Sequence, residues 1–295
     1  MIAPPFDPAE LPPGTRLSGK YRLGPVIGAG MRSVVYLATH ELLGRTVAVK
    51  VLAPGRDVMM ERLFAREARH VSALAHPNIV EVYELGRLPD GRPYLVMEYL
   101  DGETVRDRMQ REGLFSISAA VAIGRQVLDG LGAAHEKRIV HLDLRPENLS
   151  LVKVRGAEVV KILDFGISRR FGTGGDSILK TRESLLEHVT YVAPEQLFDE
   201  GVIDHRADIY STGMLLYVML TGTSPYDGRG AALVRQVAWT KPEPPSRLRP
   251  ALTSEIDRVL LCALSKDPVQ RFASAEEMGE ALRLAALFAD YLADG

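Results

Sequence analysis

The distribution of apolar residues changes near residue 100, and this change constrains the fold more than any other feature of the sequence. Before Leu100, short β-branched segments between glycine or polar turns predict strands over residues 21–28, 34–41, 45–52, 80–88 and 93–100, with one helix over 57–74. After Glu103, the spacing predicts a helix over residues 116–137, two short strands over 151–154 and 159–165, and mostly helices from residue 194. The sequence therefore predicts an α+β chain of two lobes with a ligand cleft between them.

The lobe boundary is expected near residues 100–103. Five prolines and little periodicity predict a flexible or extended leader over residues 1–19, followed by a strand-rich lobe over 20–100 and a helix-rich lobe over 101–295. The most apolar stretch, residues 211–222, is shorter than the roughly 20 residues that a bilayer requires, so it is expected to be a buried core helix. The last 20 residues form an amphipathic pattern that predicts a helix packed on the core.

Charge and cysteine content narrow the class of protein. The chain has 36 basic and 38 acidic side chains and a formal net charge of -2, which gives no reason to expect binding to nucleic acid or to a membrane surface. Cys262 is the only cysteine, so no intrachain disulfide can form, and this fits a reducing compartment such as the cytoplasm. Its apolar neighbours predict that Cys262 is a small buried residue.

A glycine-rich stretch, IGAGMRSVV at residues 27–35, precedes a strand-like sequence. A dinucleotide fingerprint needs a helix directly after its glycines, and VVYLAT does not predict one. Gly28 and Gly30 therefore lie in a hairpin, whose backbone N–H groups could approach phosphates because glycine has no side chain. Taken alone, the stretch fits an ordinary glycine turn equally well.

Lys50 ends the apolar strand VAVK, and Glu67 lies on the helix that follows. A lysine that points inward needs a counter-charge, because burying an unpaired ammonium is costly. Glu67 is the candidate partner. Two solvated charges are the commoner fate of these residue types, so the pair gains meaning only beside the other motifs.

The stretch HLDLRPEN, residues 141–148, brings together residue types suited to proton transfer and metal binding. Asp143 and Asn148 lie five residues apart in one loop, and Asp164 follows in ILDFG after an apolar strand. Carboxylate and amide oxygens are ligands that Mg²⁺ accepts together with substrate phosphates. Each Asp alone could be a turn or cap residue, but their order after the glycine hairpin, Lys50 and Glu67 is specific.

The order of these motifs resembles the protein kinase family, in the Hanks-type serine/threonine branch found in bacteria. The resemblance runs from about Tyr21 to about Leu287, and it includes GAGMRSVV, VAVK, Glu67, MEYL at 97–100, HLDLRPEN, DFG at 164–166, APE at 193–195, DIYSTG at 208–213 and DPVQRF around Arg271. It implies the two-lobed protein-kinase fold, with a β-rich N-lobe that has one main helix and a mainly helical C-lobe. It also implies phosphoryl transfer from ATP to a protein hydroxyl.

The resemblance assigns the chemical roles residue by residue. Asp143 would accept the proton of the substrate hydroxyl, and Arg145, where relatives usually have Lys, would contact the γ-phosphate. Lys50 would hold the α- and β-phosphates and pair with Glu67. Asp208 would brace the catalytic loop.

The resemblance also assigns the nucleotide and metal sites. Asn148 and Asp164 would hold Mg²⁺, while Gly28 and Gly30 would cover the phosphates. The adenine would contact a further set of residues, namely Ile27, Val35, Ala48, Met97, Glu98, Leu100 and Ser150. Glu195 and Arg271 would form a buried structural ion pair.

Several positions depart from the family pattern. Ser33 replaces the third glycine, and His188 stands where the family has a threonine near the catalytic Asp. Ser150 replaces an apolar residue under the adenine, which predicts weaker nucleotide binding. Leu142 replaces the arginine that binds a phosphate on the activation segment, so activity is predicted not to depend on phosphorylation of Ser168, Thr173, Ser177, Thr181, Ser184 or Thr190, unless Arg169 or Arg170 substitutes.

Two function classes remain open from the sequence. The favoured one is an active Mg·ATP-dependent serine/threonine protein kinase, and the alternative is a pseudokinase, a nucleotide-binding scaffold that regulates a partner. Phosphoryl transfer discriminates between them. The resemblance implies protein substrates and allows a homodimer, since bacterial relatives often pair through the N-lobe, and Glu103 and Glu147 could favour basic residues in the substrate.

Overall fold

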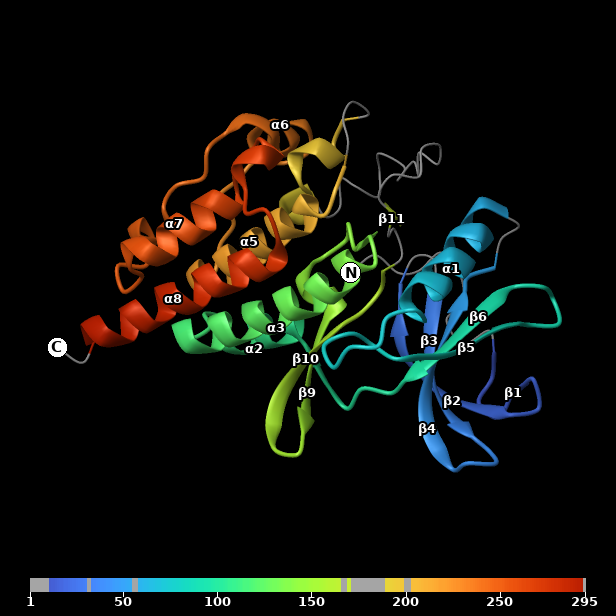
Figure 1. The fold of residues 1–295 in the computed structure, drawn as a ribbon. Coiled ribbons are helices and arrows are strands. Elements are labelled where there is room, and N and C mark those ends of the chain that lie inside the picture. Colours follow the sequence, from blue (N-terminus) through green and yellow to red (C-terminus); the bar gives the residue numbers. More distant parts are fainter. Residues whose placement is uncertain are drawn as a thin grey trace. The chain divides into compact units, whose positions relative to one another are not determined.

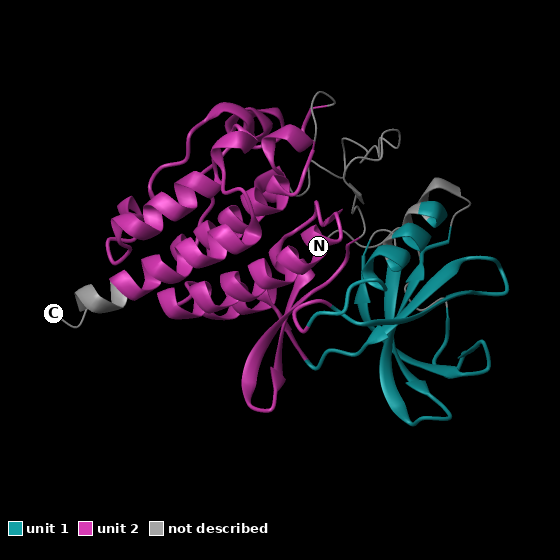
Figure 2. Cartoon of the chain, in the orientation of Figure 1, with its two compact units in different colours: residues 1–76, 80–101 teal, residues 77–79, 102–295 magenta. Residues whose placement is uncertain are grey.

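The computed structural model describes residues 11–30, 33–54, 58–165, 169–170, 189–198 and 203–293 (Figure 1). For residues 58–60, 63, 67, 169–170 and 289–293 it describes the backbone alone. The chain divides into two compact units, one of residues 1–76 and 80–101, the other of residues 77–79 and 102–295 (Figure 2). The first is rich in strands and the second in helices.

The first unit is built on a six-stranded antiparallel sheet with the order β1-β2-β3-β4-β6-β5. Its strands are β1 (Arg16–Leu17), β2 (Tyr21–Ala29), β3 (Ser33–His40), β4 (Arg45–Leu52), β5 (Val82–Arg87) and β6 (Pro93–Glu98). Along β3, buried and less buried side chains alternate, as expected for successive side chains on opposite faces. Val34, Tyr36 and Ala38 point into one core with Val49 and Tyr94. These strands confirm the pattern predicted from the sequence.

Helix α1 (Val58–Val71) covers the other face of this sheet. Its Phe64 and Ala68 are buried against Leu52 of β4 and Leu95 of β6. Their spacing of four residues places them on one side of the helix, which explains the apolar periodicity seen in the sequence. The helix predicted over residues 57–74 is confirmed within three residues at each end.

The segment before β2 differs from the flexible leader that the sequence predicts over residues 1–19. Residues 1–10 lie outside the described part of the chain, but Leu11 and Leu17 of the following segment pack on the core of the sheet. Leu17 of β1 pairs with Tyr21, is 3% exposed and joins the core with Tyr36. The backbone N–H of Gly14 donates to the carbonyl of Leu23 at 2.7 Å. Prolines at the start of this segment therefore do not prevent a short edge strand from forming after them.

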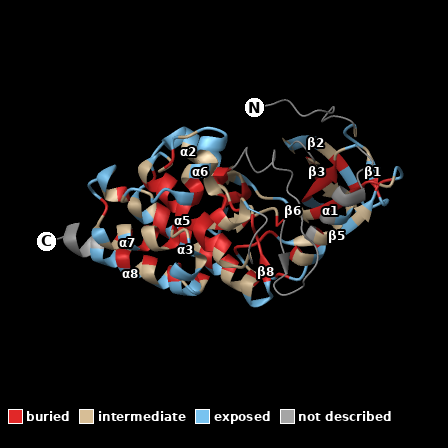
Figure 3. Cartoon of the chain, turned by 90° about the horizontal axis from the view of Figure 1, so that it is seen from above, coloured by how far each residue is buried: buried red, intermediate tan, exposed pale blue. Residues whose placement is uncertain are grey.

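The second unit packs helices around one helix that is buried on all sides. Helix α5 (Arg206–Thr221) is buried from Ala207 to Leu220, as its continuous burial in Figure 3 shows. This confirms the core helix predicted from the apolar stretch. Around it lie α2 (Val105–Glu112), α3 (Ile117–Glu136), α6 (Ala231–Trp239), α7 (Ser254–Ala263) and α8 (Ala275–Ala293). A Cβ on Gly213 of α5 would lie 2.7 Å from the Cβ of Ala263, so the glycine permits close packing of α7.

The terminal helix α8 packs as its amphipathic sequence predicts. Ala275, Met278, Leu282 and Ala285 are buried, and the helix lies along α3 and α7. Cys262 of α7 is half-buried rather than buried, and its Sγ donates to the carbonyl of Gln270 at 3.5 Å. None of the helices in the described residues is long and apolar enough to span a bilayer.

Two small sheets and short helical turns complete the second unit. β7 (Gly102–Thr104), β9 (Leu149–Val154) and β10 (Ala157–Ile162) form a three-stranded sheet of order β10-β9-β7, and β8 (Ile139–Val140) pairs with β11 (Arg169–Arg170). Single 3₁₀ turns are η1 (Pro146–Asn148), η2 (Val189–Tyr191), η3 (Pro194–Gln196), η4 (Pro245–Arg247) and η5 (Pro268–Gln270). Residues 141–148 therefore run from the end of β8 to the start of β9.

The buried position of Leu17 gives a first prediction. Leu17→Ala removes a buried side chain at a core position, and we expect it to lower the free energy of unfolding by about 2–4 kcal/mol. Urea unfolding measures the change. Leu42→Ala is the control, since Leu42 is 85% exposed and its loss is expected to cost under about 0.5 kcal/mol. Equal stability of both variants would show that residues 11–19 do not belong to the folded unit.

Candidate functional site

The loop of residues 141–148 is fixed to the core of its unit by one buried carboxylate. Asp208 comes from the first turn of α5 and is 0% exposed. Its Oδ2 accepts from the backbone N–H of His141 and its Oδ1 from that of Leu142, both at 2.8 Å. The ring Nε2 of His135, on α3, lies 2.8 Å from Oδ2. The brace predicted for Asp208 is confirmed.

Burial and hydrogen bonds act in opposite directions on this carboxylate. Burial by itself would raise the pKa of Asp208, but the hydrogen bond from His135, the nearby imidazoles and the N–H of Leu142 bring the pKa below its usual value of 3.8. The group is therefore ionised whenever the protein is folded near neutral pH. The ionised carboxylate accepts hydrogen bonds from two backbone N–H groups. Without it, both N–H groups would be buried without a partner.

His141 joins the loop to the segment that carries Asp164. The backbone N–H of Asp143 donates to His141 Nδ1 at 3.2 Å, which assigns the ring proton to Nε2. Nε2 then donates to the carbonyl of Leu163 at 2.8 Å, and the ring contacts Phe165 with centroids 4.6 Å apart. The N–H of Leu163 donates to the carbonyl of Asn148, also at 2.8 Å. Leu163 is thus held on both sides, directly before Asp164.

The candidate catalytic side chains lie together in this loop. The Nδ2 of Asn148 donates to the carbonyl of Asp143 at 2.8 Å and to its Oδ2 at 3.3 Å. The Nε of Arg145 lies 3.8 Å from the same Oδ2. Asn148 is buried, whereas Asp143 and Arg145 are partly exposed. The loop therefore presents a carboxylate to solvent while a buried amide holds its orientation.

The donor set around this loop fits Mg²⁺. Because the Nδ2 of Asn148 is directed to Asp143, its Oδ1 is the atom that can bind a cation. Asp164 adds a carboxylate and has a left-handed backbone, with φ of 54°. Within the described residues, no group of three His, Cys, Asp or Glu side chains could hold a metal ion by itself. One carboxylate and one amide oxygen suit Mg²⁺, which completes its shell with phosphate and water oxygens.

Leu142 is buried, and its side chain points away from solvent. It is 4% exposed and packs in a cluster with Val189, Ala193 and Tyr210. Its φ of 64° is unusual for a branched residue and stores strain of about 1–2 kcal/mol. Its N–H donates to Asp208 and its carbonyl accepts from Gln196 Nε2 at 3.0 Å, so both backbone groups oppose relaxation.

In the first unit, the strand register places the predicted nucleotide residues on one face of the sheet. Paired residues of antiparallel strands point to the same side. Val35 pairs with Lys50 and with Gly28, and Ala48 pairs with Met97. These five residues therefore share one face, the face on which α1 lies. Lys50 is only 8% exposed, so a charge partner is expected. The side chain of Glu67 lies outside the described residues, and the Lys50–Glu67 pair stays a prediction.

The remaining predicted adenine residues are distributed over both units. Ile27 lies in the more exposed second half of β2 and is 46% exposed. The N–H of Glu98 donates to the carbonyl of Glu81 at 2.9 Å, so the backbone group that Glu98 can offer to a base is its carbonyl. Leu100 follows β6, and Ser150 is buried on β9, paired with Lys161.

The comparison with known families agrees with this geometry. The family model described as the protein kinase domain matches residues 21–281 of the chain.

The chain belongs to the protein kinase family.

Its strand-rich unit corresponds to the N-lobe of the two-lobed kinase fold and its helix-rich unit to the C-lobe. The predicted fold class is thereby confirmed.

Similar curated proteins belong to the bacterial Hanks-type branch. The chain is 40% identical over 268 residues to the serine/threonine-protein kinase PknB of Mycolicibacterium smegmatis, covering 89% of this chain and 42% of that protein. It is 38% identical over 270 residues to PknB of Mycobacterium tuberculosis H37Rv, covering 90% and 42%. A probable serine/threonine-protein kinase of Streptomyces coelicolor is 41% identical over 271 residues, covering 89% and 39%. The chain thus spans about two fifths of the length of these relatives.

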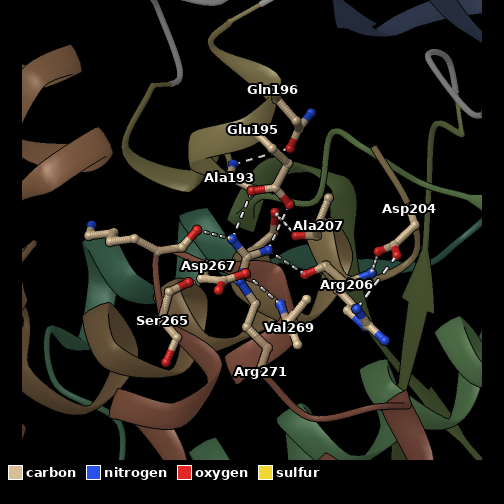
Figure 4. Close-up of polar contacts among 12 residues, drawn as sticks. Ala193, Glu195, Gln196, Asp204, Arg206, Ala207, Ser265, Asp267, Val269 and Arg271 are labelled. Carbon is tan, nitrogen blue, oxygen red and sulfur yellow. Dashed lines mark hydrogen bonds and ion pairs between the residues drawn. The ribbon is translucent and has the colours of Figure 1, made fainter. Parts of the chain in front are cut away.

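The kinase also contains the structural ion pair that its sequence predicts (Figure 4). Arg271 donates from both terminal nitrogens to the two oxygens of Glu195, each at 2.7 Å. It also donates to the carbonyls of Arg206, Ser265 and Lys266. A buried guanidinium with all its donors engaged offsets much of its desolvation cost, so the pair fixes the Ala193–Glu195 segment to the C-lobe.

Of the other positions at which the chain departs from the family pattern, only some lie within the described residues. Ser33 begins β3. His188 and the hydroxyl residues Ser168, Thr173, Ser177, Thr181 and Ser184 lie outside the described residues, whereas Thr190 lies in η2. The backbone of Arg169 and Arg170 pairs with Val140 and Ile139, directly before His141.

Two residues of the kinase site were not found from the sequence. His135 contacts Asp208 from α3, and Gln196 holds the carbonyl of Leu142 from η3. Neither belongs to a motif that carries chemistry by itself. A histidine in the last turn of a helix fits a simple dipole interaction equally well, so only the tertiary contact reveals its role.

Asp208 gives the second prediction. Asp208→Ala leaves two buried backbone N–H groups without an acceptor, each costing about 1–3 kcal/mol, so we expect unfolding to become easier by about 3 kcal/mol or more. Urea unfolding at pH 7 measures this loss, with exposed Asp129→Ala as control. Because folding lowers the pKa of Asp208, its stabilisation is complete above pH 3.8 and is lost as the pH falls through the lowered value. Wild-type stability in the alanine variant would show that the brace is dispensable.

Proposed function

We propose that this chain is an ATP-dependent protein kinase domain that phosphorylates serine or threonine hydroxyls of proteins. The observation that carries the proposal is the loop around Asp143, whose carboxylate is oriented by Asn148 while Asp208 fixes the backbone on which both stand. The relatives described as serine/threonine-protein kinases support the class of acceptor. Since the chain spans only part of those proteins, the proposal concerns the catalytic domain.

The residues present can perform the reaction by positioning and charge. Bound Mg·ATP supplies the phosphoryl group together with the metal charge that neutralises the phosphate oxygens. Asp143 accepts the proton as the hydroxyl oxygen bonds to phosphorus and the bond to the ADP oxygen breaks. The guanidinium of Arg145, near Asp143 Oδ2, adds positive charge where negative charge is transferred.

The nucleotide residues complete the proposal. Lys50 would hold the α- and β-phosphates and Gly28 and Gly30 would cover them, while Asn148 and Asp164 would hold Mg²⁺. The adenine would be lined by Ile27, Val35, Ala48, Met97, Leu100 and Ser150, with the carbonyl of Glu98 at its edge.

We further propose a signalling role in the cytoplasm. The single cysteine means that the chain needs no oxidising compartment.

The third prediction tests the activity. With Mg²⁺ and ATP labelled on the γ-phosphate, we expect transfer to the chain itself and to an unselective protein substrate. Asp143→Asn should reduce the rate by about 10²–10⁴, because the general base is lost while the shape is kept. Asp129→Asn, on the exposed side of α3, is the matched control and should keep the wild-type rate.

Two outcomes would contradict this assignment. Equal labelling in Asp143→Asn would exclude Asp143 as the base. No labelling by folded wild-type protein that still binds ATP would favour a nucleotide-binding scaffold. The dependence of self-labelling on protein concentration separates transfer between two copies, as in a homodimer, from transfer within one chain.

Leu142 gives the fourth prediction. A buried leucine cannot bind a phosphate, so activation-segment phosphorylation lacks its usual anchor. We expect phosphatase-treated kinase to keep the initial rate of the phosphorylated form on a peptide substrate. Replacing Ser168, Thr173, Ser177, Thr181 and Ser184 by alanine should also leave this rate unchanged. A large rate gain on phosphorylation that disappears in one alanine variant would overturn the prediction.

A further inference from the structure

Three arginines of α2 each meet a glutamate close to the catalytic loop. We call Glu103, Arg106, Arg108, Arg111, Glu147 and Glu158 the α2 charge cluster. Arg111 donates to Glu103 through Nη2 at 2.7 Å and through Nε at 3.3 Å. Arg108 lies between Glu103 at 2.9 Å and Glu158 at 2.7 Å. The Nε of Arg106 lies 3.3 Å from Glu147 Oε1.

The cluster lies beside the loop that carries the proposed base. Glu147 is in η1, four residues after Asp143, and α2 packs on η1 and on β9. Glu103 is on β7, paired with Leu151 of β9. The pKa of Tyr191 in η2 is raised to about 12, first by burial and then by the charge of Glu147, while Arg106 opposes the shift. Glu147 and Arg106 therefore also lie near the segment that leads to residues 193–195.

This inference rests on the proposed function. For a protein kinase, charges beside the loop that carries Asp143 affect the choice of substrate. A peptide hydroxyl that reaches Asp143 brings the neighbouring residues of the peptide past the cluster. Two carboxylates there, if unpaired, would attract lysine or arginine, which is what the sequence suggested for Glu103 and Glu147. The structure shows instead that both carboxylates already have arginine partners from the same chain.

The pairing weakens the attraction for a basic peptide in two ways. The pKa of Glu103 is lowered by hydrogen bonds from Arg111 and then Arg108, and both of its oxygens accept from these guanidiniums. A peptide cation would have to displace a guanidinium bound through two nitrogens, and it would meet repulsion from the other arginines of α2. Neither effect requires a change in the catalytic loop.

Arg106 occupies an oxygen of Glu147 that a basic residue of a peptide could otherwise bind. Its Oε1 meets Arg106, but its Oε2 is buried without a hydrogen-bond partner among the described residues. A buried carboxylate oxygen without a donor is unfavourable. If Arg106 were absent, Oε1 of Glu147 would also lack a donor, and a guanidinium from a bound peptide could supply one.

We infer that Arg106 and Arg111 are specificity-determining residues, which occupy Glu147 and Glu103 so that the kinase does not select substrates with basic residues beside the acceptor hydroxyl. The substrate class is therefore serine- or threonine-containing segments with neutral or acidic flanks. The two arginines act on the choice of peptide through the glutamates, and they do not touch the reacting atoms.

The test compares kcat/KM for three peptides that share one acceptor serine and carry Arg, Ala or Glu at the flanking positions. Wild-type kinase should use the Arg peptide no better than the Ala peptide. In the double variant Arg106→Met with Arg111→Met, the ratio of Arg to Ala peptide should rise about fivefold. Adding Glu103→Gln and Glu147→Gln should remove this gain. Arg283→Met, which breaks a comparable exposed pair with Glu280 on α8, is the matched control.

The outcomes separate this inference from the activity itself. A wild-type preference for the Arg peptide, or an unchanged ratio in the double variant, would overturn the inference while leaving the kinase assignment intact. Absence of transfer to all three peptides and to the chain itself would contradict the proposed function. In that case fluorescence anisotropy of the labelled Arg peptide still decides the inference, which requires tighter binding to the double variant than to wild type. Circular dichroism checks that the variants are folded.

Discussion

The buried carboxylate of Asp208 is the contact on which the catalytic region depends. It lies in a helix that is buried on all sides, where an isolated charge would be very unfavourable. Two backbone N–H groups and the ring of His135 surround it, so the fold retains the charge and uses it to hold the loop. The loop residue Leu142 keeps a strained backbone only because Asp208 and Gln196 hold both of its polar groups.

From this carboxylate a short series of contacts reaches Asp143, the proposed catalytic base. Asp208 holds the N–H of His141, the His141 ring holds Leu163, and Leu163 binds the carbonyl of Asn148, whose amide orients Asp143. Each link is a hydrogen bond between buried or partly buried groups, where such bonds orient more strongly than in water. The conformation of the loop of residues 141–148 is thus set by its contacts with the interior of the C-lobe.

Substrate choice rests on contacts of a different kind. The ion pairs of the α2 charge cluster are partly exposed, and each contributes little to stability. Changing them should alter which peptides are accepted without disturbing the buried contacts around Asp208. The C-lobe therefore uses two kinds of contact. Buried hydrogen bonds around Asp208 position the proposed catalytic loop, and surface ion pairs of the α2 charge cluster determine the proposed choice of peptide.

The sequence by itself determined most strands and helices, because the periodicity of buried residues is a local property, and it placed Asp143, Asn148 and Asp164 in motifs. It also indicated Asp208 and the Glu195–Arg271 pair through resemblance, although the pair joins residues far apart in the chain. Only the tertiary structure decided that Arg16 and Leu17 join the sheet, that His135 and Gln196 support the loop, and that Glu103 and Glu147 are already paired with arginines. These facts depend on which side chains meet after folding, and a charge at a given position in the sequence does not reveal whether its partner is solvent, substrate or the same chain.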